Sequence, residues 1–130
     1  MGNKTEMEEK LIALLGGRAA EKLVLNDIST GASNDIEVAT QIAKDMIIKY
    51  GMSDNLGPIS INTEKDPYEL QLLGEEFGDA IGAEVKIMLD TAYARAQTIL
   101  TNNMDKLHVV AEVLIQKEVI SAEEFEEIIK

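Results

Sequence analysis

The sequence predicts an all-α fold, a single helical domain of about five helices with an irregular segment near residues 52–78. Apolar residues recur at steps of three and four along most of the chain, which is the spacing of one face of a helix. Aromatic residues make up only 4% of the 130 residues, so the core must consist of aliphatic side chains and methionine. This length allows one hydrophobic core, and capping and stop signals separate the helical segments.

The first predicted helix covers residues 6–25, and Thr5 with Glu8 has the spacing of a capping box at its start. Gly16 and Gly17 lie inside this segment, where each glycine costs about 1 kcal/mol of helix stability relative to alanine. Two interpretations are open at this point. The glycines are either a tolerated weak spot or break in the helix, or the place where another backbone approaches it closely.

The second predicted helix covers residues 34–50, with Ser33 or Asn34 as its cap. Asn34 also has a glutamate at capping-box spacing. This start places Asp35 in the first turn, where the helix dipole favours a carboxylate by about 0.3–1 kcal/mol. Gly51 is expected to end the helix, because glycine readily adopts the left-handed conformation that follows a helix.

The least regular stretch covers residues 52–78. Turns are predicted at residues 56–58 and again at residues 66–67, where glycine and proline interrupt the pattern. Apolar and polar side chains alternate over residues 59–62, which is typical of a short extended segment. Residues 69–77 are interpreted as either a short helix or a mobile loop.

Three further helices are predicted in the second half of the chain, at residues 79–100, at residues 104–117 and after Ser121. Residues 101–103 are expected to separate the helix at residues 79–100 from the helix at residues 104–117. Glu124 lies three residues after Ser121, so the two form a capping box for the final helix. The apolar residues of the final helix that are expected to pack against the domain are Phe125, Ile128 and Ile129.

The charge of the chain excludes two classes of partner. Twelve basic residues stand against 24 acidic ones, a formal net charge of −12, and such a surface repels nucleic acid and anionic lipid. No apolar run approaches the roughly 20 residues that a membrane helix needs, so we expect no membrane contact by this chain itself and a soluble domain. The absence of cysteine excludes disulfides and thiolate metal sites.

The residues alone indicate little chemistry. His108 is the only histidine, and its position in a helical segment is more typical of a structural or surface residue than of a ligand. The Gly16-Gly17 pair lies in a helix and lacks the pattern of a phosphate-binding loop, so ATP binding by this chain is not supported. The helix dipole is enough to explain a carboxylate at Asp35, and Glu21 is interpreted as an ordinary surface charge, so neither indicates a functional site by itself.

Two sequence blocks carry a resemblance to a known family. They are residues 14–21 (LLGGRAAE) and residues 29–40 (STGASNDIEVAT), which occur in this order and at this spacing. Weaker matches follow at residues 51–53, 56–58, 84–85, 92–93, 95–96, 99–100 and 114–120. Over nearly its whole length the chain resembles the peptidase domain of the FtsH family, the membrane-anchored ATP-dependent zinc metalloproteases. Gly82 departs from the acidic residue expected there.

The resemblance implies site residues. In that family two histidines of a His-Glu-x-x-His helix and a later aspartate hold the catalytic zinc, and the motif glutamate is the general base. The matching aspartate here is Asp35, the candidate metal ligand. Glu21 matches a glutamate that supports the zinc site by orienting a ligating histidine. No His-Glu-x-x-His occurs in these residues, so no catalytic residue is assigned within this chain and the general base is expected upstream.

Residues 1–130 are therefore interpreted as the C-terminal part of a zinc metalloprotease domain that lacks the His-Glu-x-x-His helix, the ATPase module and the membrane anchor. The resemblance implies a parent that degrades misfolded or regulatory proteins as a six-membered ring at the cytosolic face of a membrane, that of the bacterial plasma membrane. Zinc belongs to the parent, and ATP with Mg²⁺ to its separate ATPase module. The isolated chain is expected to hold no cofactor and to be inactive. The alternative is a non-catalytic helical adaptor or oligomerisation module on the same fold.

Overall fold

The computed structural model describes residues 2–26, 33–56, 67–117 and 120–130. The elements in chain order are α1 (Lys4–Leu25), α2 (Ser33–Ile48), α3 (Pro67–Asn102), the 3-10 helix η2 (Met104–Lys106), α4 (Leu107–Lys117) and α5 (Ala122–Ile129). Five α-helices and no strand are found in the described ranges, which confirms the all-α prediction. In those same ranges no helix combines the length and the apolar character needed to cross a bilayer.

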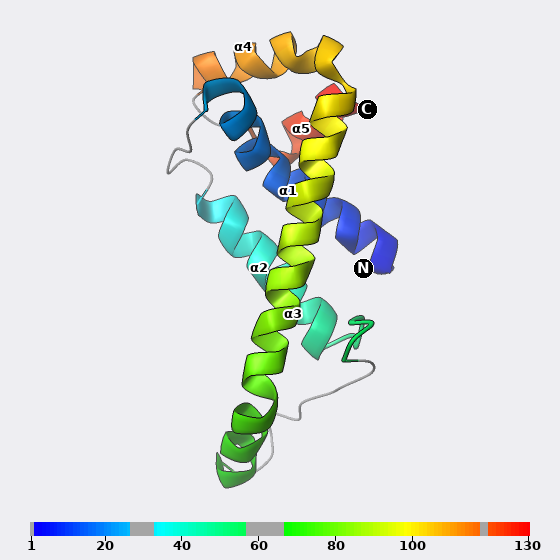
Figure 1. The fold of residues 1–130 in the computed structure, drawn as a ribbon, viewed down its shortest axis with the longest axis vertical. Coiled ribbons are helices and arrows are strands. Elements are labelled where there is room, and N and C mark those ends of the chain that lie inside the picture. The colour runs from blue at the N-terminus through cyan, green and yellow to red at the C-terminus, as the bar shows by residue number, and fades with distance from the viewer. Residues whose placement is uncertain (1, 27–32, 57–66, 118–119) are drawn as a thin grey trace.

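Helix α3 runs the length of the molecule, and the other helices gather around its C-terminal two thirds (Figure 1). Helix α1 is the centre of the packing, because it contacts α2, α3 and α5 most extensively. Helix α4 lies across one end of the domain, above α5 (Figure 1). The buried residues form three hydrophobic clusters, two of which include residues of α1. The largest fully buried apolar side chains are Leu11, Met46, Ile47, Leu100, Val110, Leu114 and Ile120.

The start of α1 differs from the prediction. The side chain of Asn3, not of Thr5, caps the helix, and its oxygen accepts a hydrogen bond of 2.9 Å from the backbone N–H of Glu6. Thr5 lies inside the first turn instead. Asparagine is among the best capping residues, so the nearest upstream candidate determines where the helix begins.

The two glycines of α1 lie where α5 and Ile120, two residues before α5, pack against the helix. A Cβ atom at Gly17 would lie 2.5 Å from the backbone oxygen of Ile120, and a Cβ atom at Gly16 would lie 2.6 Å from the ring of Phe125. The interpretation as a close approach by another backbone is therefore confirmed at Gly17, whereas at Gly16 the approaching group is the side-chain ring of Phe125. The glycines let α5 come within contact of the α1 backbone.

Helix α2 begins at Ser33, and both proposed capping residues, Ser33 and Asn34, therefore lie in its first turn. A cap before them falls outside the described residues. The helix ends before Gly51 as predicted, and Gly51 has the left-handed φ of 59°. The backbone N–H of Met52 then donates to the carbonyl oxygen of Met46 at 2.8 Å, which turns the chain back along the helix.

Helix α3 begins at Pro67 rather than at residue 79, so half of the predicted irregular segment is helical. Proline is well tolerated at the first position of a helix, and here it marks a helix start rather than a turn. Gly78 and Gly82 have no atom within 4 Å of where a Cβ would lie. They cost helix propensity but cause no break. The predicted extended segment at residues 59–62 lies outside the described residues.

The last helices follow the prediction closely. Residues 104–106 form a 3-10 turn that leads into α4, so the predicted single helix is divided near its start. Ser121 and Glu124 form the predicted capping box, with hydrogen bonds of 3.1 Å to the Ser121 hydroxyl oxygen and 3.3 Å to the Glu124 carboxylate. Phe125 is buried against α1, as predicted. His108 is an exposed residue of α4, which confirms the surface interpretation.

Candidate functional site

Asp35 lies in the first turn of α2, as the sequence predicts, and its side chain is partly buried. Burial raises the pKa of the Asp35 carboxyl above its ordinary value, the negative charge of Glu123 raises it further, and Lys10 offsets part of this. A carboxylate that has lost some of its hydration and faces a second carboxylate is stabilised by a nearby cation. The surroundings of Asp35 thus suit a carboxylate that binds a positive charge.

Three helices supply the charged groups around Asp35. Lys10 comes from α1 and Glu123 from the first turn of α5, and their nitrogen and oxygen atoms are 4.0 Å apart. Both side chains are solvent-exposed, so this pair is a weak one. Lys10 is shared between two carboxylates, which leaves the region around Asp35 with a surplus of negative charge.

Glu21 lies inside α1 and is fully buried, at 0% exposure. The interpretation of Glu21 as a surface charge is therefore wrong. A carboxylate in the interior is tolerated only when a polar or charged group compensates it, and Glu21 does have such an interaction. Its burial fixes the side chain in one place, as a residue that orients another group requires. Its role and that of Asp35 stay predictions.

The described residues do not by themselves fit a zinc centre. Within these ranges no three histidine, cysteine, aspartate or glutamate side chains gather to hold a metal ion. The Nδ1 atom of His108 lies 2.9 Å from the backbone oxygen of Asp105, in the 3-10 helix η2 just before α4. A catalytic zinc takes three protein ligands and one water, so Asp35 can supply one ligand and the others must come from elsewhere.

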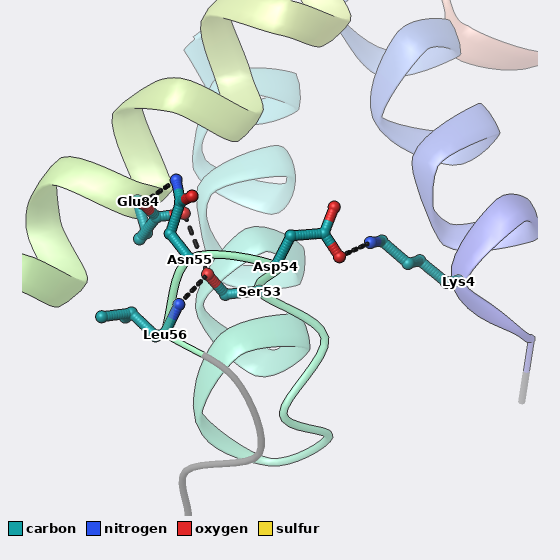
Figure 2. A network of polar contacts seen from close by, with 6 residues as sticks. All are labelled: Lys4, Ser53, Asp54, Asn55, Leu56 and Glu84. Atoms are coloured by element: carbon teal, nitrogen blue, oxygen red, sulfur yellow. Dashed lines mark hydrogen bonds and ion pairs between the residues drawn. The ribbon is translucent and has the colours of Figure 1, made fainter.

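A buried polar network joins α3 to the turn after α2, and Figure 2 shows its members. The carboxylate of Glu84 accepts hydrogen bonds of 2.9 Å from the Ser53 hydroxyl and 2.8 Å from the Asn55 amide. The Ser53 oxygen in turn accepts a bond of 3.1 Å from the backbone N–H of Leu56. Glu84 is only 8% exposed, so these bonds replace the water that its charge has lost.

Sequence reasoning assigned no role to this network. Glu84 lies three residues after Ile81 and four before Met88, which places it on the apolar stripe of α3. An acidic residue at such a position is a signal that a polar partner is needed, and this signal could have been used. Its partners are separated from it by 29 and 31 residues, so the sequence could not name them.

The comparisons with known proteins identify the family of the chain. The model of peptidase family M41 matches residues 1–128. The chain belongs to peptidase family M41. This confirms the resemblance to the FtsH peptidase domain, because both specific sequence blocks, with Glu21 and Asp35, lie inside the matched region.

Relatives of this M41 chain are bacterial proteins named ATP-dependent zinc metalloprotease FtsH. FtsH 1 of a Thermoanaerobacter species is 47% identical over 133 aligned positions, which cover 97% of this chain and 22% of that protein. FtsH of Caldicellulosiruptor bescii is 46% identical and FtsH of Thermotoga maritima 39% identical, each over 98% of this chain and 22% of the relative. The chain thus spans about a fifth of the length of these relatives.

Proposed function

We propose that this M41 chain is part of an ATP-dependent zinc metalloendopeptidase that degrades misfolded or regulatory proteins. The family match over residues 1–128 and the names of the relatives support this proposal. The observation that carries it is the position of Asp35, a partly buried carboxylate in the first turn of α2 with a second carboxylate nearby. A partly buried carboxylate at the start of a helix is compatible with a role as a metal ligand.

In this proposal Asp35 supplies one oxygen ligand to zinc, and the helix start fixes the direction of its carboxylate. Glu21, held in the interior of α1, supports the site by orienting a ligating histidine. When bound, zinc lowers the pKa of a water molecule and so provides the nucleophile for peptide hydrolysis. The two histidines and the general base come from a His-Glu-x-x-His helix outside these 130 residues.

The division of the site has a consequence for the isolated chain, and the resemblance adds two further parts to the proposal. The isolated chain binds zinc weakly and does not cleave protein, because a single carboxylate does not make a tetrahedral site and no base is present to take a proton from water. ATP and Mg²⁺ bind in a separate module of the parent protein. The parent works as a six-membered ring on protein substrates at the cytosolic face of the bacterial plasma membrane.

The test uses the full-length parent protein with Asp35→Asn, which keeps the shape of the side chain and removes its charge. We expect loss of bound zinc and of casein degradation, with ATP hydrolysis unchanged. Glu37→Gln is the matched control, because Glu37 is an exposed carboxylate two residues further along the same helix. Full zinc content and activity in the Asp35→Asn protein would show that another residue is the ligand. A parent that binds no zinc and degrades no protein would favour the adaptor alternative.

A further inference from the structure

A groove of about 540 Å³ lies between the beginning of α1, the middle of α3 and the turn that follows α2. We call it the α1–α3 groove. Lys4 and Asp54 border it, as do the buried Glu84 and its partner Asn55. None of the residues assigned to the candidate metal site, Asp35 and Glu21, lines it. The groove is therefore a second feature of the domain that the proposed hydrolysis does not use.

The end of the groove is fixed by contacts to both of its sides. Lys4 of α1 pairs with Asp54 at 2.9 Å, and the neighbouring residues Ser53 and Asn55 donate to Glu84 of α3 (Figure 2). The turn thus bridges the two helices. The hydrogen bonds to the buried Glu84 carboxylate hold the turn against α3, whereas the solvent-exposed Lys4–Asp54 pair adds little, so one side of the groove is fixed before a ligand binds.

The floor of the groove is apolar and contains three methionines. Met46 is buried, Met52 and Met88 are half-buried, and Ile87 at the edge is 48% exposed. Methionine has a flexible, polarisable side chain, and surfaces rich in it adapt to apolar partners of different shape. Such a floor favours apolar side chains without selecting one particular sequence.

The charges on the rim define the partner further. Among the described residues Glu9 and Arg95 form no ion pair, whereas Lys4 interacts with the Glu8 carboxylate as well as with Asp54. Glu8 and Glu9 are adjacent exposed carboxylates on α1, in a chain of net charge −12. They attract a basic side chain. The guanidinium of Arg95 offers N–H donors to peptide carbonyl oxygens.

We infer that the α1–α3 groove docks an extended stretch of unfolded polypeptide in which apolar residues alternate with lysine or arginine. Apolar side chains enter the methionine-lined floor, basic side chains pair with Glu8 and Glu9, and Arg95 binds the peptide backbone. The biological role of the groove rests on the proposed function, because a protease for misfolded proteins gains from holding substrate away from the catalytic centre. The binding itself does not require zinc, ATP or cleavage.

The test measures binding of a fluorescein-labelled peptide of alternating leucine and lysine to the 130-residue chain by fluorescence anisotropy. We expect saturable binding that weakens at high salt, and much weaker binding of a peptide in which glutamate replaces lysine. Ile87→Asp should weaken binding about tenfold, because it places a charge at the apolar edge of the groove. Ile115→Asp is the matched control, since Ile115 is an isoleucine of α4 that is 74% exposed and does not line the groove.

The rim charges have their own matched pair of variants. Glu8→Gln with Glu9→Gln should weaken binding of the leucine-lysine peptide about threefold or more at low salt. Glu126→Gln with Glu127→Gln, two adjacent exposed carboxylates on α5, should leave it unchanged. Circular dichroism confirms that each variant is folded.

Three outcomes would overturn the inference. The first is that Ile87→Asp and Ile115→Asp weaken binding of the leucine-lysine peptide equally. The second is that the chain binds the glutamate peptide as tightly as the lysine peptide. The third is a dimer in sedimentation that Ile87→Asp dissociates, which would assign the groove to a second copy of this chain. Failure of the proposed function is distinguishable, because it is read from zinc content and casein degradation. Peptide binding by the chain is measured without either.

Discussion

Replacement of Gly17 by alanine tests the packing of α5 on α1. The added Cβ would lie 2.5 Å from the Ile120 carbonyl oxygen and 2.9 Å from the Ile120 Cγ2 atom. Ordinary van der Waals contact begins near 3.4 Å, so the backbone of α1 and the backbone at Ile120 must separate by most of an ångström. A carbonyl oxygen cannot move aside as the end of a flexible side chain can, and the strain therefore falls on the helix packing.

The magnitude follows from two opposing effects. Overpacking of a well-packed interior costs about 1–3 kcal/mol, and the upper value applies here because the obstacle is backbone. Alanine regains about 1 kcal/mol of helix propensity relative to glycine. We therefore expect Gly17→Ala to lower the free energy of unfolding by about 2 kcal/mol.

Gly82→Ala in α3 is the matched control. Gly82 is exposed, lies inside a helix and has no atom within 4 Å of where its Cβ would lie, so only the propensity effect remains. We expect this variant to raise the free energy of unfolding by about 1 kcal/mol. Urea unfolding followed by circular dichroism measures both. A Gly17→Ala protein as stable as the original, or more stable, would refute the close approach of Ile120 to α1.

Two further predictions concern carboxylates. Glu84→Ala removes the carboxylate that accepts a hydrogen bond from the buried Ser53 hydroxyl, and we expect the free energy of unfolding in urea to fall by about 2 kcal/mol. The control is Asp90→Ala on the exposed side of α3, which should lower the free energy of unfolding by less than half of that. The hydrogen bond from Lys117 holds the pKa of Glu124 below its ordinary value. The ionised Glu124 therefore contributes its full stabilisation at a pH above the ordinary carboxyl pKa, and this stabilisation is lost as the pH falls through the lowered pKa. Unfolding measured between about pH 5 and pH 3 should therefore show a smaller fall in stability for Glu124→Gln than for the original protein, and equal slopes would contradict this.

The parts of the fold that could be predicted from the sequence depend on local signals. The capping box of Ser121 and Glu124 spans three residues, and the place of Asp35 in the first turn of α2 depends on the residues beside it. The start of α3 at Pro67 also depends on a local signal, but proline marks both turns and helix starts, and the sequence was interpreted as a turn there. Local signals therefore located the helices better than their ends.

The parts that could not be predicted depend on contacts between distant segments. Gly17 has its explanation in Ile120, and Glu84 has its partners at Ser53 and Asn55. The burial of Glu21 is likewise a property of the folded domain that its sequence neighbours do not indicate. For the candidate site the sequence located Asp35, and the family resemblance rather than periodicity gave it a role.

The contact between Gly17 and Ile120 also influences the surroundings of Asp35, the candidate metal ligand. Because Gly17 lacks a Cβ, Ile120 can rest on the α1 backbone, and this brings the first turn of α5 against α1. Glu123 lies in that turn and pairs with Lys10 of α1, and these two charges are the ones that act on Asp35. A small residue in the middle of α1 is thus connected, through the position of α5, to the electrostatic field at the start of α2. A change at Gly17 that moved α5 outward would weaken the influence of Glu123 on Asp35 as well as the packing, because both depend on the same close approach.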